Sequence, residues 1–333
     1  MNTTLSDKVS LFHKLKSKQC VNNQTLLIIN YDYFLHKRDY KVLLQSYQTI
    51  YLIPFHDTNI FFSKDIIFEL ISDASNLTLV HNPMFDSYIE NSVEVSLSSN
   101  RHLQVCSVFD FCEQYLFKCY VSDNQTVLTP HLQGLKYFNY RIRLLKKIID
   151  LGIGIPLYIL TQPLWLISAF KIFQESPGSI FFKQSRVGIR NAEFTIFKFR
   201  SMRLDAEILG AQFSSKNDSR IFNWGKLMRT TRIDELPQLF NILKGELSLI
   251  GPRPERKVFI ETFEDLIPHY NERHSVKPGI SGYAQVMYNY GSGVSDARHK
   301  LMYDLYYVKN WSLKLEFKII FLTLWTIISK KGI

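Results

Sequence analysis

Glycine is missing from the front of the chain: all 14 glycines lie at or after Gly134. A glycine-rich loop that cradles phosphate groups therefore cannot lie before that position, which excludes an N-terminal dinucleotide-binding fingerprint. Cysteine is scarce too, with four residues and no pair at the CxxC spacing. That pattern argues against a zinc site and against a small disulfide scaffold, so we expect plain reduced or buried thiols.

Two further absences concern the compartment and the overall order of the chain. The N-terminal segment has no apolar run long enough for a signal peptide, so we expect the chain to start in a reducing cytoplasm. No tract has a composition that predicts extensive disorder, because 46% of the residues are hydrophobic and only 21% are charged. The length of 333 residues fits two modest domains or one large one.

Acidic residues are under-represented in the back of the chain only. Residues 136–333 contain 30 basic and 17 acidic residues, whereas residues 1–135 contain 10 basic and 13 acidic ones. We therefore expect the back half to bind an anion, which at this level can be nucleic acid, acidic lipid or a phosphorylated substrate.

Short apolar runs alternate with helical patterns between residues 23 and 130. This alternation predicts a small α/β domain with a mostly parallel sheet over residues 1–135. No catalytic cluster stands out in it, so we expect a regulatory or interaction role. The predicted strands are Thr25–Asn30, Thr49–Pro54, Leu77–His81 and Leu103–Val108, and the predicted helices are Tyr33–Gln48 and Ser63–Ala74.

A linker near residues 129–140 precedes the most apolar stretch of the chain. Leu151–Phe170 contains no charged residue and is long enough to span a bilayer as a straight helix. Pro156 and Pro163 argue against a straight helix, because proline removes a helical hydrogen bond and clashes with the preceding turn. A re-entrant hairpin over about residues 148–171, broken near Gln162-Pro163, fits these facts best. A true span and a buried helix of a soluble domain are the alternatives.

A second apolar stretch lies near the C-terminus. Ile319–Ser329 is too short to cross a bilayer and lies between lysines on both sides. It fits an interfacial helix with its lysines at the headgroups. It fits equally well a terminal helix that packs onto a globular domain.

Between these stretches, the first charged motif spans Phe182–Arg190 and Phe194–Met202. The second half predicts a strand, with Lys198 on it and Arg200 just beyond. Basic side chains at a strand end beside a glycine turn suit phosphate binding. A solvated basic edge strand has the same pattern.

The second motif, Leu227–Asn241, contains the adjacent carboxylates Asp234 and Glu235, with Arg229 and Arg232 before them. One interpretation is a helix N-terminus, since acidic residues favour the positive end of the helix dipole. The other is catalytic: one carboxylate attacks while the other holds a divalent metal.

Two more motifs offer cations on constrained backbone. In Leu249–Arg256 the sequence Pro-Arg-Pro fixes the chain on both sides of Arg253, which suits a guanidinium that forks onto phosphate oxygens. In His274–Val286 a turn-rich stretch offers Lys277 and backbone amides.

Taken together, KFRSM, RTTRIDELPQLFNILKGELSLIGPRP, HSVKPGISGYAQV and DLYYVKNWSLKLEFKII, in that order, resemble the bacterial sugar transferase family. The resemblance covers about residues 136–333. Members are monotopic polyprenyl-phosphate phosphoglycosyl transferases that begin exopolysaccharide, capsule or O-antigen assembly. Membership implies an α+β catalytic domain with a re-entrant helix hairpin and interfacial helices.

The resemblance also implies roles for individual residues. Asp234 matches the nucleophile and Glu235 the metal-associated carboxylate, while cations match the elements that meet the nucleotide-sugar phosphates. This sequence departs from the family at Gln162-Pro163, where members usually have Ser-Pro, and at Tyr283, where many have Trp. The cations expected at the substrate are Lys198, Arg200, Arg229, Arg253 and Lys277.

The expected activity is transfer of a sugar 1-phosphate from a UDP-sugar to undecaprenyl phosphate, with release of UMP, through a covalent phosphosugar on Asp234. The implied cofactor is Mg²⁺, and the implied location is the cytoplasmic face of the bacterial inner membrane. Membrane lipids are expected partners and nucleic acid is not; a homo-oligomer stays open. The alternatives are a non-catalytic nucleotide-sugar-binding scaffold and a soluble two-domain glycosyltransferase. The motifs do not specify the sugar.

Overall fold

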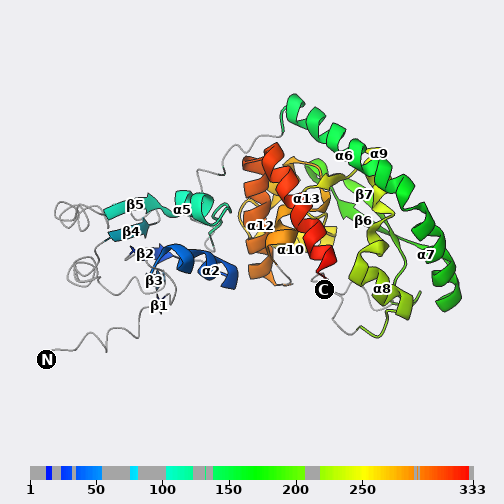
Figure 1. The fold of residues 1–333 in the computed structure, drawn as a ribbon, viewed down its shortest axis with the longest axis horizontal. Coiled ribbons are helices and arrows are strands. Elements are labelled where there is room, and N and C mark those ends of the chain that lie inside the picture. The colour runs from blue at the N-terminus through cyan, green and yellow to red at the C-terminus, as the bar shows by residue number, and fades with distance from the viewer. Residues whose placement is uncertain are drawn as a thin grey trace. The chain divides into compact units, whose positions relative to one another are not determined.

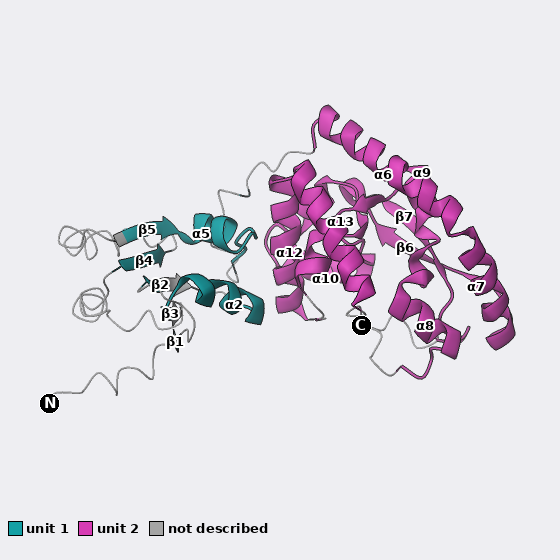
Figure 2. Ribbon diagram, viewed as in Figure 1, with its two compact units in different colours: residues 1–133 teal, residues 134–333 magenta. Residues whose placement is uncertain are grey.

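The computed structural model describes residues 13–16, 24–31, 35–54, 76–81, 103–122, 132, 138–206, 218–288, 291 and 293–329. The chain divides into two compact units, residues 1–133 and residues 134–333 (Figure 2).

Unit 1 is built on a five-stranded sheet with the strand order β1-β3-β2-β4-β5. Neighbouring strands from β3 to β5 run parallel, and β1 joins the sheet antiparallel to β3. The described elements of unit 1 are β1 (His13–Lys16), β2 (Gln24–Tyr31), α2 (Lys37–Ser46), β3 (Thr49–Pro54), β4 (Asn76–His81), β5 (Leu103–Ser107) and α5 (Val108–Tyr115).

The prediction of a mostly parallel α/β sheet is confirmed, and all four expected strands are present. Strand β1 was not predicted, since its four residues carry no apolar run. The helix expected over Tyr33–Gln48 begins later, at Lys37, because His36 caps it: the His36 side chain accepts from the N–H of Arg38, and Asp39 accepts from the N–H of His36. The helix expected over Ser63–Ala74 lies outside the described residues.

An ion pair is buried among the described residues of unit 1. Lys118 Nζ lies 2.6 Å from Asp39 Oδ2, and the two side chains are 0% and 3% exposed. Burial of a charge is tolerated only when a partner compensates it, so this pair is a tightly matched one. Of the described cysteines, Cys112 and Cys119 are buried and Cys106 is half-buried, and all three are free thiols as expected.

Unit 2 contains most of the helices and two small sheets (Figure 1). Strands β6 and β7 form an antiparallel hairpin, and β8 pairs parallel with β9. The described elements are α6 (Tyr140–Leu160), α7 (Gln162–Glu175), β6 (Phe181–Val187), η5 (Ile189–Asn191), β7 (Glu193–Phe199), α8 (Asn223–Thr231), η6 (Ile233–Glu235), α9 (Gln238–Lys244), β8 (Ser248–Ile250), α10 (Lys257–Leu266), η7 (Tyr270–Ser275), β9 (Gly279–Ser281), α11 (Tyr283–Met287), α12 (Val294–Lys309) and α13 (Leu313–Ile328).

The long apolar segment forms the two helices α6 and α7, which meet at an angle of 55°. Helix α6 continues through Pro156, and the bend lies at Thr161, directly before Gln162-Pro163. The Gln162 side-chain amide donates to the Tyr158 carbonyl at 2.9 Å, and the Thr161 hydroxyl donates to the Leu157 carbonyl at 2.7 Å. The Gln162 amide thus provides the Tyr158 carbonyl with a donor at the broken turn, whereas the Leu157 carbonyl also accepts from the Thr161 N–H at 3.0 Å. Among the described residues, no single helix is both long enough and apolar enough to cross a membrane. Only the bent pair α6–α7, taken together, meets both requirements.

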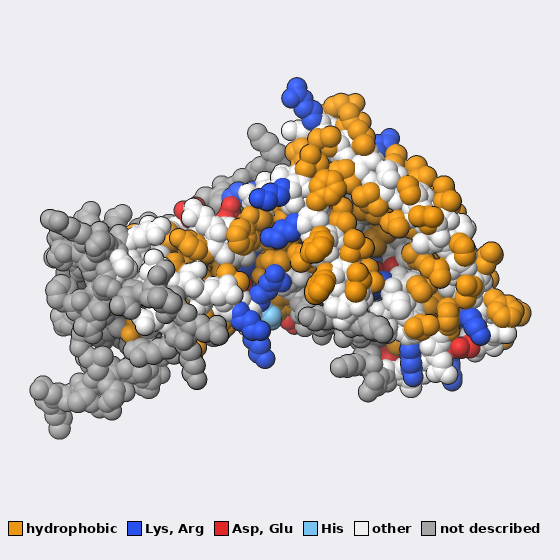
Figure 3. All heavy atoms as spheres, in the orientation of Figure 1, with side chains coloured by type: hydrophobic (Ala, Val, Ile, Leu, Met, Phe, Trp, Pro, Cys, Tyr) orange, Lys and Arg blue, Asp and Glu red, His pale blue; other side chains and the backbone are white. Residues whose placement is uncertain are grey.

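Large apolar side chains cover the outer faces of α6, α7 and α13. Figure 3 shows them gathered on one face of unit 2. Leu160, Leu166 and Phe170 are 61–75% exposed, and on α13 Phe321 and Ile328 are 66% and 75% exposed. The alternative that residues 151–170 form a buried core helix is therefore wrong. Helix α13 packs onto the globular unit through Leu315 and Ile319, while its other side is exposed and apolar, and its place at a membrane interface stays a prediction.

Lys146, which precedes the apolar segment, is buried in unit 2. The side chain is 7% exposed, and its ammonium donates to Glu316 at 2.6 Å, to Tyr307 Oη at 2.9 Å and to the Ile250 carbonyl at 2.9 Å. Lys146 therefore ties α6 to α12, α13 and the end of β8. The sequence pattern does not indicate this buried ion pair, because Glu316 lies 170 residues further along the chain.

Strands β8 and β9 bring two backbone segments unusually close. A Cβ on Gly251 would lie 2.4 Å from the Lys277 carbonyl oxygen, and a Cβ on Gly279 would lie 2.1 Å from the Gly251 nitrogen. Only glycine fits at such an approach. The start of the Pro-Arg-Pro segment is thereby fixed against the turn before β9.

Candidate active site

The two adjacent carboxylates lie in η6, a short 3₁₀ turn directly after α8. Helix α8 ends at Arg232, whose left-handed backbone (φ 61°) redirects the chain, and α9 begins only at Gln238. The interpretation of Asp234-Glu235 as the N-terminus of a helix is therefore correct only in part: the two residues lie in the 3₁₀ turn η6, and helix α9 begins three residues after Glu235. The turn places both carboxylates between the strand β7 and the Pro-Arg-Pro segment, and both residues are 8% exposed.

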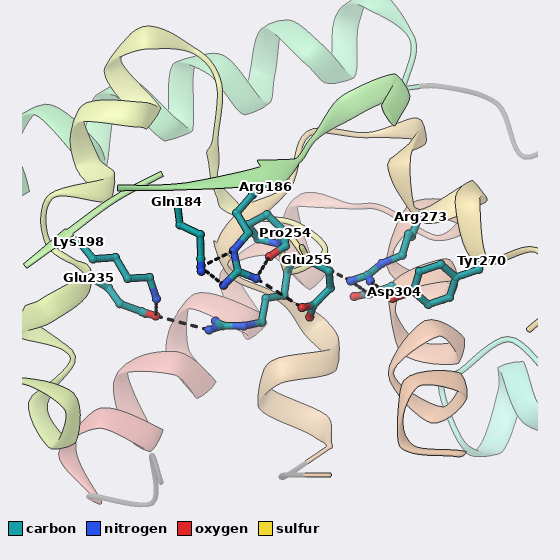
Figure 4. Close-up of polar contacts among 10 residues, drawn as sticks. Gln184, Arg186, Lys198, Glu235, Pro254, Glu255, Tyr270, Arg273 and Asp304 are labelled. Atoms are coloured by element: carbon teal, nitrogen blue, oxygen red, sulfur yellow. Dashed lines mark hydrogen bonds and ion pairs between the residues drawn. The ribbon is translucent and has the colours of Figure 1, made fainter. Parts of the chain in front are cut away.

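Glu235 is surrounded by cations from three elements. Lys198 on β7 donates to its Oε1 at 2.9 Å, and Arg253 Nη2 lies 3.7 Å from the same oxygen (Figure 4). Arg232 Nη1 lies 3.9 Å away. All three contacts are to Oε1. Lys198 and Arg253, both predicted for the site, are therefore brought to it by the fold.

These cations determine the charge of Glu235. Burial alone would raise the pKa of this carboxyl, but the charges of Lys198, Arg253 and Arg232, with the hydrogen bond from Lys198, outweigh burial and lower the pKa to about 2. Glu235 is therefore ionised at every physiological pH.

Asp234 has the opposite electrostatic balance. Burial raises its pKa to about 6, and the neighbouring charge of Glu235 adds to the rise, against the opposing charges of Lys198, Arg229 and Arg232. No hydrogen bond from the described residues reaches its carboxylate. An oxygen that is desolvated, ionised near neutral pH and free of hydrogen bonds is well suited to attack an electrophile.

Arg229 lies close enough to Asp234 for their charges to interact, and its Nε donates to Ser201 Oγ at 2.9 Å. Asp218 and Arg220 also act on it, and burial lowers its pKa from the usual range. Arg229 is thus the predicted cation on the Asp234 side of the pair.

Two predicted residues have other neighbours. The Arg200 guanidinium donates to the carbonyl and hydroxyl of Ser176 and to the Ser179 carbonyl, so it ties the end of α7 to the hairpin. Lys277 lies near Asp150 and close to Gly245 at the end of α9. Direct contact of Arg200 and Lys277 with substrate stays a prediction, and neither side chain contacts the two carboxylates.

Arg186 lies beside the candidate site and was not among the predicted site residues. It lies on β6, donates to the Pro254 carbonyl and forms an ion pair with Glu255 (Figure 4). These two partners are the residues that follow Arg253 in the chain. Its pKa is lowered to about 10, mainly by burial and further by the charges of Arg253 and Arg256. The only sequence signal was its place in the basic stretch Phe182–Arg190.

The donor set at the two carboxylates fits one kind of metal site. No group of three or more His, Cys, Asp or Glu side chains that could hold a metal gathers among the described residues. Mg²⁺ is often held by only one or two protein carboxylates, with water and substrate phosphate as the other ligands. Glu235 fits that arrangement, because its Oε2 takes no part in the contacts with Lys198, Arg232 and Arg253.

A comparison with known families identifies the back half of the chain. Residues 141–330 match the family model of the bacterial sugar transferases. The chain belongs to this family. The resemblance drawn from the four ordered motifs is thereby confirmed.

Three relatives illustrate the range of this bacterial sugar transferase family. A UDP-N-acetylgalactosamine-undecaprenyl-phosphate N-acetylgalactosaminephosphotransferase of Aeromonas hydrophila is 50% identical over 180 residues, 54% of this chain and 42% of the relative. A UDP-glucose:undecaprenyl-phosphate glucose-1-phosphate transferase of Xanthomonas campestris pv. campestris is 43% identical over 172 residues, 51% of this chain and 36% of the relative. The exopolysaccharide production protein PSS of Rhizobium leguminosarum bv. phaseoli is 37% identical over 183 residues, 53% of this chain and 92% of the relative.

The shared part has a similar length each time, from 172 to 183 residues, and the chain spans less than half of the first two relatives. Almost the whole of the Rhizobium relative aligns with little more than half of this chain. The common part therefore corresponds in size to the bacterial sugar transferase unit alone.

Proposed function

We propose that this protein transfers a sugar 1-phosphate from a UDP-sugar to undecaprenyl phosphate and releases UMP. The observation that carries the proposal is the unequal pair of carboxylates: Asp234 has a raised pKa and accepts no hydrogen bond from the described residues, while Glu235 is ion-paired to Lys198. The named relatives from Aeromonas and Xanthomonas, which act on UDP-sugars and undecaprenyl phosphate, supply the substrate classes.

In the first step, a carboxylate oxygen of Asp234 forms a bond to the β-phosphorus of the UDP-sugar. The bond from that phosphorus to the bridging oxygen breaks, and UMP leaves with the electron pair. In the second step, a phosphate oxygen of undecaprenyl phosphate attacks the same phosphorus and frees the Asp234 carboxylate. The lipid then carries the sugar on a diphosphate.

A diphosphate repels an attacking carboxylate, so its charge must be neutralised for the first step to proceed. Arg229 is placed to do this on the Asp234 side, and Lys198 and Arg253 on the Glu235 side. A Mg²⁺ ion held by Glu235 and the substrate phosphates would supply further neutralisation. We therefore include Mg²⁺ in the proposal as the cofactor.

The exposed apolar faces of α6, α7 and α13 support attachment to a membrane. We propose that the α6–α7 pair enters and leaves one leaflet at the cytoplasmic face of the inner membrane, with α13 at the interface. The bend at Thr161 and the side-chain hydrogen bonds to the Tyr158 and Leu157 carbonyls suit such a path, since no water is present to satisfy backbone groups there. The lipid acceptor would then meet the two carboxylates at headgroup level.

The topology is tested by labelling single cysteines from each side of the membrane in a background without the four native cysteines. Exposed Lys147, before the segment, and Lys171, after it, are suitable positions. We expect both to label from the cytoplasmic side. Labelling from opposite sides would show a true span. Pro163→Leu should straighten the pair and change the pattern toward a span.

The reaction itself is tested by release of UMP from a panel of UDP-sugars in the presence of undecaprenyl phosphate and Mg²⁺. UDP-N-acetylgalactosamine is the first donor to test, because the Aeromonas relative named for it is 50% identical. A radiolabelled sugar should remain on the protein when the lipid acceptor is withheld, and Asp234→Asn should retain none. Binding of a UDP-sugar without UMP release in any combination would instead indicate a scaffold. An active, monodisperse preparation without detergent would favour the soluble glycosyltransferase.

A further inference from the structure

The Pro-Arg-Pro segment connects β8 to α10 without forming a helix or a strand of its own. Pro252 and Pro254 have no N–H, so the segment has few donors with which to form local hydrogen bonds. Yet it must hold Arg253 so that the guanidinium lies 3.7 Å from Glu235. The contacts of its carbonyl groups explain how it is held.

Four consecutive carbonyl oxygens each accept a hydrogen bond from a different donor elsewhere in unit 2. The Pro252 oxygen accepts from the Gly279 N–H at 3.0 Å, and the Glu255 oxygen accepts from the Val187 N–H at 3.0 Å. Between them, the Arg253 oxygen accepts from Arg273 Nη2 at 2.9 Å, and the Pro254 oxygen accepts from Arg186 Nη1 at 3.1 Å. The two central anchors are therefore arginine side chains.

Arg273 is itself firmly fixed. It is 5% exposed, its Nη2 lies 2.8 Å from Asp304 Oδ2 on α12, and its Nη1 donates to Tyr270 Oη at 2.8 Å (Figure 4). The rigid guanidinium thus contacts an acid, a hydroxyl and the Arg253 carbonyl at once, which a lysine ammonium does not reproduce.

Arg186 is fixed from the opposite side. Its Nε and Nη2 both donate to Gln184 Oε1, at 3.0 and 2.6 Å, and its Nη1 also lies 3.6 Å from Glu255 Oε2. Gln184 and Arg186 lie on the same strand, β6, which pairs with the strand that carries Lys198. The hairpin therefore positions one contact of Glu235 directly and a second through the Pro-Arg-Pro segment.

We propose that Arg186 and Arg273 are positioning residues that hold the Arg253 guanidinium at Glu235 and at the diphosphate of the donor. The second half of this statement rests on the proposed function, whereas the anchoring of the segment does not. A displacement of about 1 Å at a charge-neutralising group lowers a rate by roughly 100-fold. Two residues that never touch the substrate thus set the rate through Arg253.

The anchoring is tested by amide hydrogen exchange of the full-length protein in detergent, read in peptides that cover residues 250–257. The variants are Arg186→Gln and the double variant Arg273→Met with Asp304→Asn, which leaves no unpaired carboxylate buried. We expect exchange in this region to become at least about tenfold faster in both. Tyr270→Phe is the matched control, since it keeps the contacts of Arg273 with Asp304 and with the Arg253 carbonyl, and it should not change the region by more than about twofold. Unchanged protection in the two anchor variants would overturn the proposal.

The route through Arg253 is tested by double-mutant cycles on UMP release. Each anchor variant should lower kcat/KM for the donor by roughly 100-fold in the wild-type background and by less than about twofold in an Arg253→Ala background. Losses that add fully in both backgrounds would show general damage and overturn the proposal.

These readouts also separate the inference from the proposed function. If the wild-type protein releases UMP from no donor, the proposed function is wrong, and the exchange experiment alone decides the anchoring. If the wild-type protein is active and exchange is unaffected by the anchor variants, the positioning role is wrong and the function stands.

Discussion

The two units each bury carboxylates beside cations, but in different proportions. In the described part of unit 1, Lys118 Nζ lies 2.6 Å from Asp39 Oδ2, so one buried cation contacts one buried acid. In unit 2, Glu235 has three cations within 4 Å, while the adjacent Asp234 accepts no hydrogen bond from the described residues. A matched pair neutralises itself and holds the fold together. Around Asp234 and Glu235 the cations outnumber the acids. Glu235 therefore stays ionised, Asp234 titrates near neutral pH, and the excess of positive charge is suited to an anionic substrate.

The largest effect should come from replacing Asp234, the acid that accepts no hydrogen bond from the described residues. Asp234→Asn keeps the shape of the side chain but removes the nucleophile, so we expect UMP release to fall by at least about 1000-fold. Retention of phosphosugar on the protein should disappear as well. Robust turnover by this variant would rule out a covalent mechanism.

The next largest effect should come from removing one of the cations that contact Glu235. Lys198→Met removes the ammonium 2.9 Å from Glu235 Oε1, and we expect kcat to fall about 100-fold. Lys183→Met is the matched control, since Lys183 is an exposed lysine on the other strand of the same hairpin and should leave the rate almost unchanged. Equal losses in both variants would mean that the charge of the hairpin as a whole matters, and not the contact with Glu235.

A smaller effect should follow from pH. Asp234 must be ionised to attack, and its raised pKa of about 6 means that kcat/KM should fall as the pH drops through 6, by roughly tenfold between pH 7 and pH 5. Glu235→Gln removes a negative charge that raises this pKa, so the acid limb of the profile should move to lower pH. It should also weaken the dependence on Mg²⁺. A limb that stays in place would show that Asp234 does not control it.

The smallest effect on transfer should come from the matched pair. Lys118→Met removes the ammonium that lies 2.6 Å from the buried Asp39 carboxylate and should lower the free energy of unfolding of unit 1 by about 3 kcal/mol. Transfer activity should stay within about twofold of wild type, because the Rhizobium relative consists almost entirely of the shared unit. Denaturant unfolding followed beside UMP release measures both. A parallel loss of activity would instead show that unit 1 supports catalysis.

The sequence predicts best those features whose cause is local. The strands of unit 1 follow from apolar runs between turns. Asp234 and Glu235 are adjacent in the chain, so their proximity required no tertiary information. The break near Gln162-Pro163 is likewise predicted from proline chemistry.

The features that escaped prediction depend on contacts between distant residues. Nothing near Arg186 in the sequence indicates that it reaches the Pro254 carbonyl, 68 residues later. Arg200 belongs to a phosphate-binding type of motif, yet its donors are taken up by Ser176 and Ser179 in the preceding connection. Charge patterns in the sequence show that cations gather in unit 2, but the packing of β6, β7 and η7 decides which ones reach the carboxylates.

The buried contact between Lys146 and Glu316 has a consequence for the order in which unit 2 can form. Lys146 leaves the ribosome long before its partner, which follows 170 residues later. Until Glu316 is synthesised, the ammonium would lack the carboxylate that it contacts at 2.6 Å and would keep the charge of Asp150, so burial of α6 on β8 and α12 would be less favourable. Complete assembly of the catalytic unit therefore depends on α13, and the apolar outer face of α6 is synthesised and exposed well before the contacts that fix its inner face exist.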